Sequence, residues 1–139
     1  MLTDIDHIVQ ARLHTPESGP EGHEITATLR YHRDDPLAAR VAFPASVSLD
    51  GAEVTWVFGR GLLTTGLYEP AGEGDVHVRP AGPDRTVLEF RAHQGVALVE
   101  VATTDLRIFL ARVYEAVPPG HEFRGVDMDA VVAFLLGEE

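Results

Sequence analysis

The sequence predicts an α+β fold in which antiparallel β-sheets are joined by a short mid-chain helix and followed by C-terminal helices. Two observations lead to this fold class. Apolar and polar residues alternate strictly along residues 22–33, as in a half-buried strand, and apolar residues take helical spacing after Thr103. Runs of strands followed by helices are typical of α+β proteins. The length of 139 residues suits one domain, so we expect residues 1–139 to form a single domain.

Four strands are expected in the first part of the chain. They lie at residues 4–14, 22–33, 39–43 and 54–58, and segments rich in turn-forming residues separate them. The strand at 22–33 has the cleanest pattern, with one apolar and one polar face. Its apolar face comprises Ile25, Ala27, Leu29 and Tyr31.

The pattern changes to helical spacing at residues 60–68, which predicts a short helix that Pro70 and Gly72 bring to an end. Three further strands follow, at residues 75–79, 86–92 and 96–101. Two helices close the chain, one beginning at Thr103 and one near Asp127. The expected order is therefore four strands, a short helix, three strands and two helices.

The charge balance excludes several classes of protein. The chain carries 22 acidic residues and 11 basic residues, a net charge of −11, and every basic residue is an arginine. The arginines are scattered singly, so a polyanion would meet net repulsion, and we expect no nucleic-acid binding. The absence of cysteine excludes disulfides and thiolate zinc sites. The absence of lysine and asparagine indicates a GC-rich genome.

The sequence also predicts where the protein resides. Residues 1–6 contain two acids and no basic residue, unlike a secretory signal peptide. The apolar run at residues 131–136 is far shorter than the ~18 residues that a membrane-spanning helix needs. We therefore expect a cytoplasmic protein without a transmembrane segment.

No pattern of polar residues predicts catalysis. No two of the seven histidines have the i,i+2 or i,i+4 spacing of a ligand pair. Glu89 and Glu100, on adjacent predicted strands, could form an acid–base pair, but solvent-facing strand carboxylates are far commoner. Tyr31, Trp56 and Phe58 could stack on nucleic-acid bases, but their alternation favours a place in the core. We therefore predict a non-enzymatic binding or scaffolding protein with no catalytic residues, metal or cofactor.

Three stretches of the chain resemble the SsgA-like proteins, a family of sporulation and cell division proteins of filamentous actinomycetes. They are WVFGRGLLTTGL at 56–67, GEGDVHVRP at 72–80, and FL at 109–110 followed by AVPPG at 116–120 and Glu122. With VDMD at 126–129, the resemblance covers roughly residues 25–136 in matching order and spacing. The motifs are short, and their order makes the resemblance specific.

Most residues of these motifs have a structural interpretation. Gly66 allows a helix to approach the sheet closely, and Gly72 and Gly74 permit a left-handed turn. Two prolines and a glycine at 118–120 give the chain a rigid path out of the preceding helix. The motif residues expected to serve the fold are Trp56, Phe58, Leu62, Leu63, Gly66, Gly74, Asp75, Pro118, Pro119 and Gly120.

The resemblance implies an adaptor of the division machinery. Members of the family recruit the tubulin-like protein FtsZ to future septum sites, together with a paralogue of the SsgA type. The resemblance also implies a homotrimer located at the septum and the whirly-like architecture of single-stranded DNA-binding proteins. The alternative function is therefore a whirly-like single-stranded nucleic-acid-binding protein, against which the net charge argues.

The sequence suggests where a protein partner could bind. We expect the helix at 60–68 and the glutamates of nearby loops to be exposed. The predicted partner contacts are Arg60, Tyr68, Glu69, Glu73 and Glu115.

Overall fold

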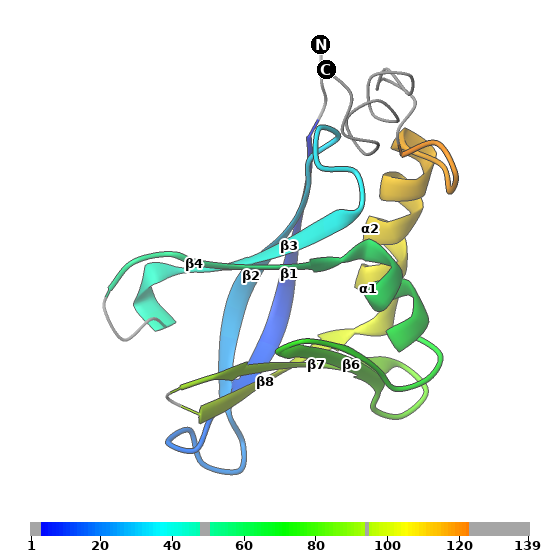
Figure 1. Ribbon diagram of the computed structural model, residues 1–139. Helices are drawn as coiled ribbons and strands as arrows, with labels where there is room; N and C mark the ends of the chain where they lie inside the picture. Colours follow the sequence, from blue (N-terminus) through cyan, green and yellow to red (C-terminus); the bar gives the residue numbers. More distant parts are fainter. Residues whose placement is uncertain (1–3, 48–50, 94, 123–139) are drawn as a thin grey trace.

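A computed structural model describes residues 4–47, 51–93 and 95–122 of the chain. These residues form one eight-stranded sheet and two α-helices, which lie together on one side of the sheet (Figure 1). The strands are β1 (Ile5–His14), β2 (His23–Tyr31), β3 (Ala38–Phe43), β4 (Val54–Gly59), β5 (Ala71–Glu73), β6 (Val76–Pro80), β7 (Arg85–Ala92) and β8 (Gly95–Ala102). The helices are η1 (Ala45–Val47, a 3₁₀ turn), α1 (Arg60–Gly66) and α2 (Thr103–Ala116).

Neighbouring strands are antiparallel throughout, in the order β4-β3-β2-β1-β8-β7-β6-β5. This confirms the predicted α+β class, although the strands make one sheet rather than several. The alternation in β2 is also confirmed, since Ile25, Ala27, Leu29 and Tyr31 are all buried. β1 and β8 pair only through residues 11–14 of β1, so the two halves of the sheet join along a short seam.

The sheet curls, and its two halves close on an apolar core (Figure 1). Phe90 of β7 marks where they meet. Its ring centroid lies 5.6 Å from that of Phe43, 5.0 Å from that of Trp56 and 6.4 Å from that of Phe58. Tyr31 and Phe58 are buried, which confirms the core interpretation of these aromatic residues over base stacking.

Helix α2 covers the end of the core beside β1 and β8. It begins at Thr103 as predicted, with Asp105 in the first turn, where a carboxylate favours the helix dipole. The buried side chains on its inner face recur at helical spacing. They are Leu106, Phe109, Leu110 and Val113.

Two elements differ from the prediction. β5 lies where the sequence predicts a loop. The prediction missed this strand because three residues, one of them Gly72, are too few to show an alternation of apolar and polar side chains. Helix α1 ends at Gly66 rather than Tyr68, and the backbone N–H groups of Leu67 and Tyr68 continue it as a turn. The helix predicted to begin near Asp127 lies outside the described residues.

Candidate functional site

Arg60 is the centre of the most extensive polar network among the described residues, and its side chain is 3% exposed. It is the first residue of α1, directly after Gly59 of β4. An arginine so deeply buried needs partners for its charge and its N–H donors. The surrounding contacts therefore decide whether this residue is a binding group or a structural one.

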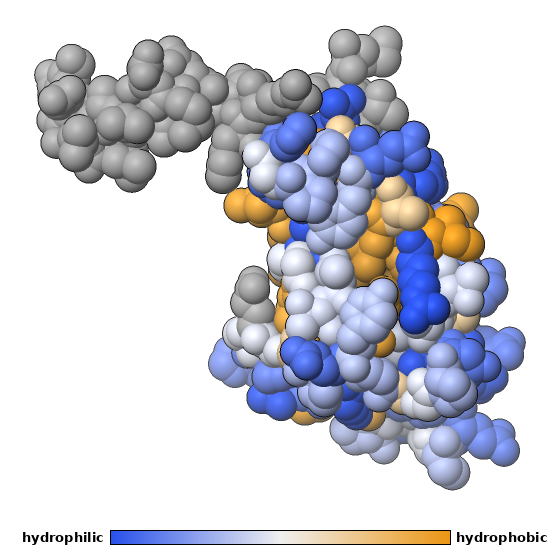
Figure 2. All heavy atoms as spheres, turned by 90° about the vertical axis from the view of Figure 1, so that its right-hand side faces the viewer, coloured by the Kyte–Doolittle hydropathy of each residue, from blue (hydrophilic) through white to orange (hydrophobic). Residues whose placement is uncertain are grey.

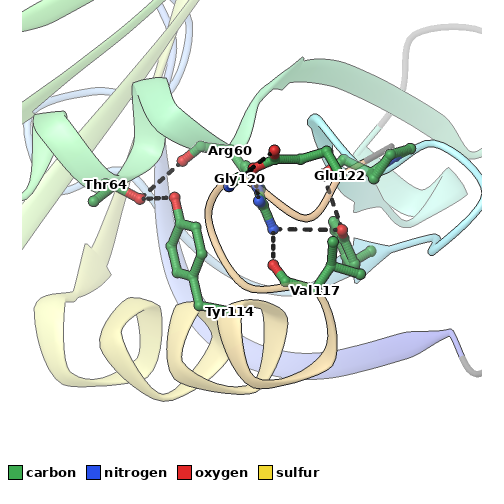
Figure 3. A network of polar contacts seen from close by, with 8 residues as sticks. Arg60, Thr64, Tyr114, Val117, Gly120 and Glu122 are labelled. Carbon is green, nitrogen blue, oxygen red and sulfur yellow. Dashed lines mark hydrogen bonds and ion pairs between the residues drawn. The ribbon is translucent and has the colours of Figure 1, made fainter. Parts of the chain in front are cut away.

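The partners of Arg60 come from the end of α2 and the turn that follows it (Figure 3). One guanidinium nitrogen donates to the backbone oxygen of Val117 at 2.7 Å, and the other donates to the carboxylate of Glu122. The guanidinium also lies over the ring of Tyr114, 4.5 Å from its centroid, at cation–π distance. Arg60 thus joins the β4–α1 junction to the C-terminal end of α2.

Three hydroxyl groups extend the network. The Thr64 hydroxyl donates to the backbone oxygen of Arg60 at 3.0 Å and shares a hydrogen bond with the Tyr114 hydroxyl at 2.7 Å. The Tyr31 hydroxyl donates to the backbone oxygen of Pro36 at 2.9 Å. Burial raises the pKa of Tyr31, while the positive charge of Arg60 opposes that rise. Tyr31 therefore stays neutral and acts as a hydrogen-bonding group.

Glu122 closes the network from the turn after α2. Its carboxylate accepts hydrogen bonds from the backbone N–H of Gly120 at 3.1 Å, and the His121 N–H donates to the Pro118 oxygen at 2.9 Å. Hydrogen bonds from its own backbone N–H, from Gly120 and from Arg60 hold the pKa of Glu122 below its ordinary value. The positive φ of Gly120, 87°, supports the predicted role of residues 118–120 as a defined exit from the helix.

The prediction that Arg60 is an exposed partner contact is wrong. The first turn of α1 points this side chain inward, beneath the end of α2, where its donors are used within the chain. The pattern of the sequence could not reveal this, because the partners Val117 and Glu122 are 57 and 62 residues away. Arg60 is therefore a structural clamp.

The other predicted partner residues lie near the two helices. Tyr68 is 70% exposed, and the guanidinium of Arg107 on α2 lies 5.9 Å from its ring centroid. Glu69 is exposed in the turn after α1, and Glu115 is exposed in the last turn of α2 rather than in a loop. Glu73 lies in β5. On the face that includes the helices, apolar surface is bordered by hydrophilic side chains (Figure 2).

Several of the motif residues expected to serve the fold are buried, pack closely or form a turn. Leu62 and Leu63 are buried, and a Cβ on Gly66 would lie 2.3 Å from Cγ1 of Val78, so helix and strand touch there. Gly74 has a φ of 60°, the left-handed conformation expected for this turn. Gly72 does not adopt it; a Cβ there would instead lie 2.2 Å from the His77 ring.

Glu89 and Glu100 do not form an acid–base pair. Glu89 accepts hydrogen bonds from Arg91 at 2.5 Å and Arg79 at 3.4 Å, and Glu100 accepts one from Arg85 at 3.0 Å. The hydrogen bond from Arg91 lowers the pKa of Glu89, and that from Arg85 lowers the pKa of Glu100. A general acid near neutral pH needs a raised pKa, so these groups serve as surface ion pairs.

An apolar cleft of about 750 Å³ lies at the open end of the curled sheet. Trp56, Phe90 and Val99 line its floor, and Val54 and Val96 stand at its rim. No group of three or more histidine, aspartate or glutamate side chains that could hold a metal ion occurs within residues 4–47, 51–93 and 95–122. In the same residues no helix is long and apolar enough to cross a membrane.

Comparison with known proteins agrees with this architecture. The family described as "Streptomyces sporulation and cell division protein, SsgA" matches residues 25–122. This chain belongs to that family. The family match contains every residue of the Arg60 network, since it begins before Tyr31 and ends at Glu122.

Relatives of this chain are described as sporulation-specific cell division proteins. The sporulation-specific cell division protein SsgB of Kineococcus radiotolerans is 40% identical over 96% of this chain and 81% of that protein. SsgB of Salinispora tropica is 45% identical over 81% of this chain and 80% of that protein. The crystal structure of an SsgA-like sporulation-specific cell division protein from Thermobifida fusca matches with a TM-score of 0.79 and 36% identity, covering 95% of each chain. The relatives support a role in cell division.

Proposed function

We propose that this protein is a non-enzymatic adaptor in sporulation-specific septation, closest to the SsgB type, which recruits and positions FtsZ at septum sites by direct contact. The single observation that carries the proposal is the family match across residues 25–122, with relatives named as sporulation-specific cell division proteins. The described polar groups support it, because Arg60, Glu89 and Glu100 all form ion pairs with other residues of the same chain. We propose that the protein works in the cytoplasm as a homotrimer of whirly-like subunits with an SsgA-type paralogue.

The surface around Tyr68 is the proposed FtsZ contact. Tyr68 is 70% exposed, and the guanidinium of Arg107 on α2 lies 5.9 Å from its ring centroid. Tyrosine and arginine are enriched among residues that dominate the binding energy of protein interfaces. An exposed tyrosine in contact with an arginine loses little side-chain freedom when a partner covers both.

Co-sedimentation with polymerised FtsZ tests the proposal. The wild-type protein should enter the FtsZ pellet, and Tyr68→Ala should reduce the pelleted fraction several-fold by removing about 2 kcal/mol of contact energy. Ile8→Ala is the matched control, because Ile8 is 66% exposed on the outer face of β1. This variant should enter the pellet to the same extent as the wild type. Absence of wild-type protein from the pellet would overturn the FtsZ proposal. Normal pelleting of Tyr68→Ala would move the contact away from this surface.

A titration with single-stranded oligonucleotides tests the alternative function. A nucleic-acid binder would show strong binding at low salt that weakens steeply as salt is added. The net charge of −11 leads us to expect a flat fluorescence-anisotropy curve under all salt conditions. A salt-dependent rise in anisotropy would replace the adaptor proposal with the whirly-like alternative.

A further inference from the structure

The two edges of the sheet differ in how they are protected. β5, at one edge, has only three residues, and a short edge strand offers little to pair with. β4, at the other edge, has six residues, Val54–Gly59, with no charged residue and no proline among them. Among the described residues it pairs with β3 alone. An uncharged edge strand of this length is a template for pairing with another chain.

The register shows which backbone groups of β4 point away from β3. The Arg60 N–H donates to the Leu37 oxygen at 2.9 Å, in continuation of the β3–β4 ladder. Hydrogen-bonded positions alternate along an antiparallel pair, so Phe58 and Trp56 also bond to β3. The N–H groups of Thr55, Val57 and Gly59, which are the intervening positions, therefore point to the open edge.

Two exposed apolar side chains lie near this edge. Val57 is 52% exposed, and Leu37, in the turn before β3, is 51% exposed. They border a shallow hollow of about 500 Å³ that is also lined by Ala38, Phe58, Leu62, Gly59 and Gly61 and by the acidic residue Asp35. Glycines at an edge allow another backbone to come close. The hollow therefore offers apolar side chains and one carboxylate near the Gly59 end of β4.

We propose that β4 binds an extended segment of a partner protein by strand addition. In this mode the backbone bonds at Thr55, Val57 and Gly59 supply affinity, and the exposed Val57 side chain favours apolar residues in the added strand. The net charge of −11 favours a segment with basic residues at its ends. This site is separate from the Tyr68 surface, and the inference does not require FtsZ to be the partner.

A second copy of the chain fits this edge less well. Six residues extend only about 20 Å, so β4–β4 pairing would bury far less than the ~1,200 Å² of a stable dimer. A transient complex with a short extended segment does not need an interface of that size.

The test uses the whole protein and a nine-residue peptide of alternating valine and threonine with a lysine at each end. Titration followed by ¹H–¹⁵N NMR should shift the amide signals of Thr55, Val57 and Gly59 more than those of Trp56 and Phe58. Val57→Pro should weaken binding about tenfold, because it removes one open N–H and leaves the bonds to β3 in place. Val57→Lys should also weaken binding about tenfold while keeping the whole backbone, in case the proline variant does not fold.

The controls separate strand addition from other occupants. Val57→Thr keeps the N–H and the β-branched shape and should bind normally, whereas the same peptide with a central proline should not bind. Shifts centred on Trp56 and Val99 would place the peptide in the apolar cleft and overturn the proposal. Slow hydrogen exchange at Val57 without peptide would overturn it too, because the edge would already be paired. A fall in mass by light scattering in Val57→Lys would assign the edge to a second copy instead of a partner segment.

Discussion

Arg60 illustrates how one side chain can be misassigned from sequence and still be decisive for the fold. A charged residue that opens a short helix suggests an exposed position, yet this one is buried with its donors on Val117 and Glu122. The planar guanidinium can bond two oxygens and lie over the Tyr114 ring at the same time, which the lysine ammonium cannot do. The position therefore depends on arginine specifically.

Replacing Arg60 with methionine should destabilise the protein. The change leaves the Val117 oxygen and the Glu122 carboxylate without their buried donor, and we expect the free energy of unfolding in urea to fall by about 3 kcal/mol. Arg91→Met is the matched control, since Arg91 is exposed beside Glu89 and should cost at most about 1 kcal/mol. Arg60→Met and Glu122→Gln should be non-additive when combined, because they act on one contact. Additive effects would show that the clamp does not form.

Helix α1 is an element that cannot stand alone. It has seven residues, no side-chain cap and no acid in its first turn, and isolated helices shorter than about 12–15 residues are marginal in water. Packing of Leu62 and Leu63 into the core, the contact of Gly66 with Val78 and the Arg60 clamp hold it in place. Tertiary contacts rather than helix propensity therefore stabilise α1.

Two glycines of α1 should respond to alanine in opposite directions. Gly66→Ala should destabilise the protein by about 1–3 kcal/mol, because the new methyl group would collide with the Val78 side chain. Gly61→Ala should stabilise it by about 0.5–1 kcal/mol, because Gly61 is exposed, lies in the helix and has no heavy atom within 4 Å of an added Cβ. Thermal unfolding of both variants measures the difference. A stabilising Gly66→Ala would show that α1 does not pack this closely on β6.

The whole molecule carries an excess of carboxylates, and several of them are held by arginine partners. Glu89, Glu100 and Glu122 all have pKa values below the ordinary value of 4.5, and hydrogen bonds to the charged form are the leading cause for each. A depressed pKa in the folded state means that ionisation favours folding. These groups therefore stabilise the fold at neutral pH and lose that effect in acid.

The melting temperature should fall as the pH drops below 4.5. Above 4.5 the carboxylates are ionised in both the folded and unfolded states; below it the unfolded chain takes up protons first, which favours unfolding. Glu122→Gln should lower the melting temperature at neutral pH, and its difference from the wild type should shrink in acid. Circular dichroism melts across this range measure both effects. A melting temperature that rises on acidification would contradict the assignment.

Much of the fold could be predicted from local patterns. The alternation in β2, the switch to helical spacing at Arg60 and the start of α2 at Thr103 depend on side chains that are close in sequence. Period-2 and period-3.6 patterns report these directly, because each element must turn its apolar residues toward the core. The family motifs also predicted a close approach of helix and sheet at Gly66. Its lack of a side chain leaves room for the Val78 side chain.

The remaining features depended on contacts between distant segments. Composition and periodicity determined the α+β class, the acidic surface charge and the elements long enough to show a repeat. Only the tertiary structure decided that all strands described join one curled sheet, that Arg60 is a buried clamp, and that β4 is an edge with open N–H groups. The physical reason is that burial and strand pairing are properties of residues brought together from far apart, and a local pattern carries no information on which segments will meet.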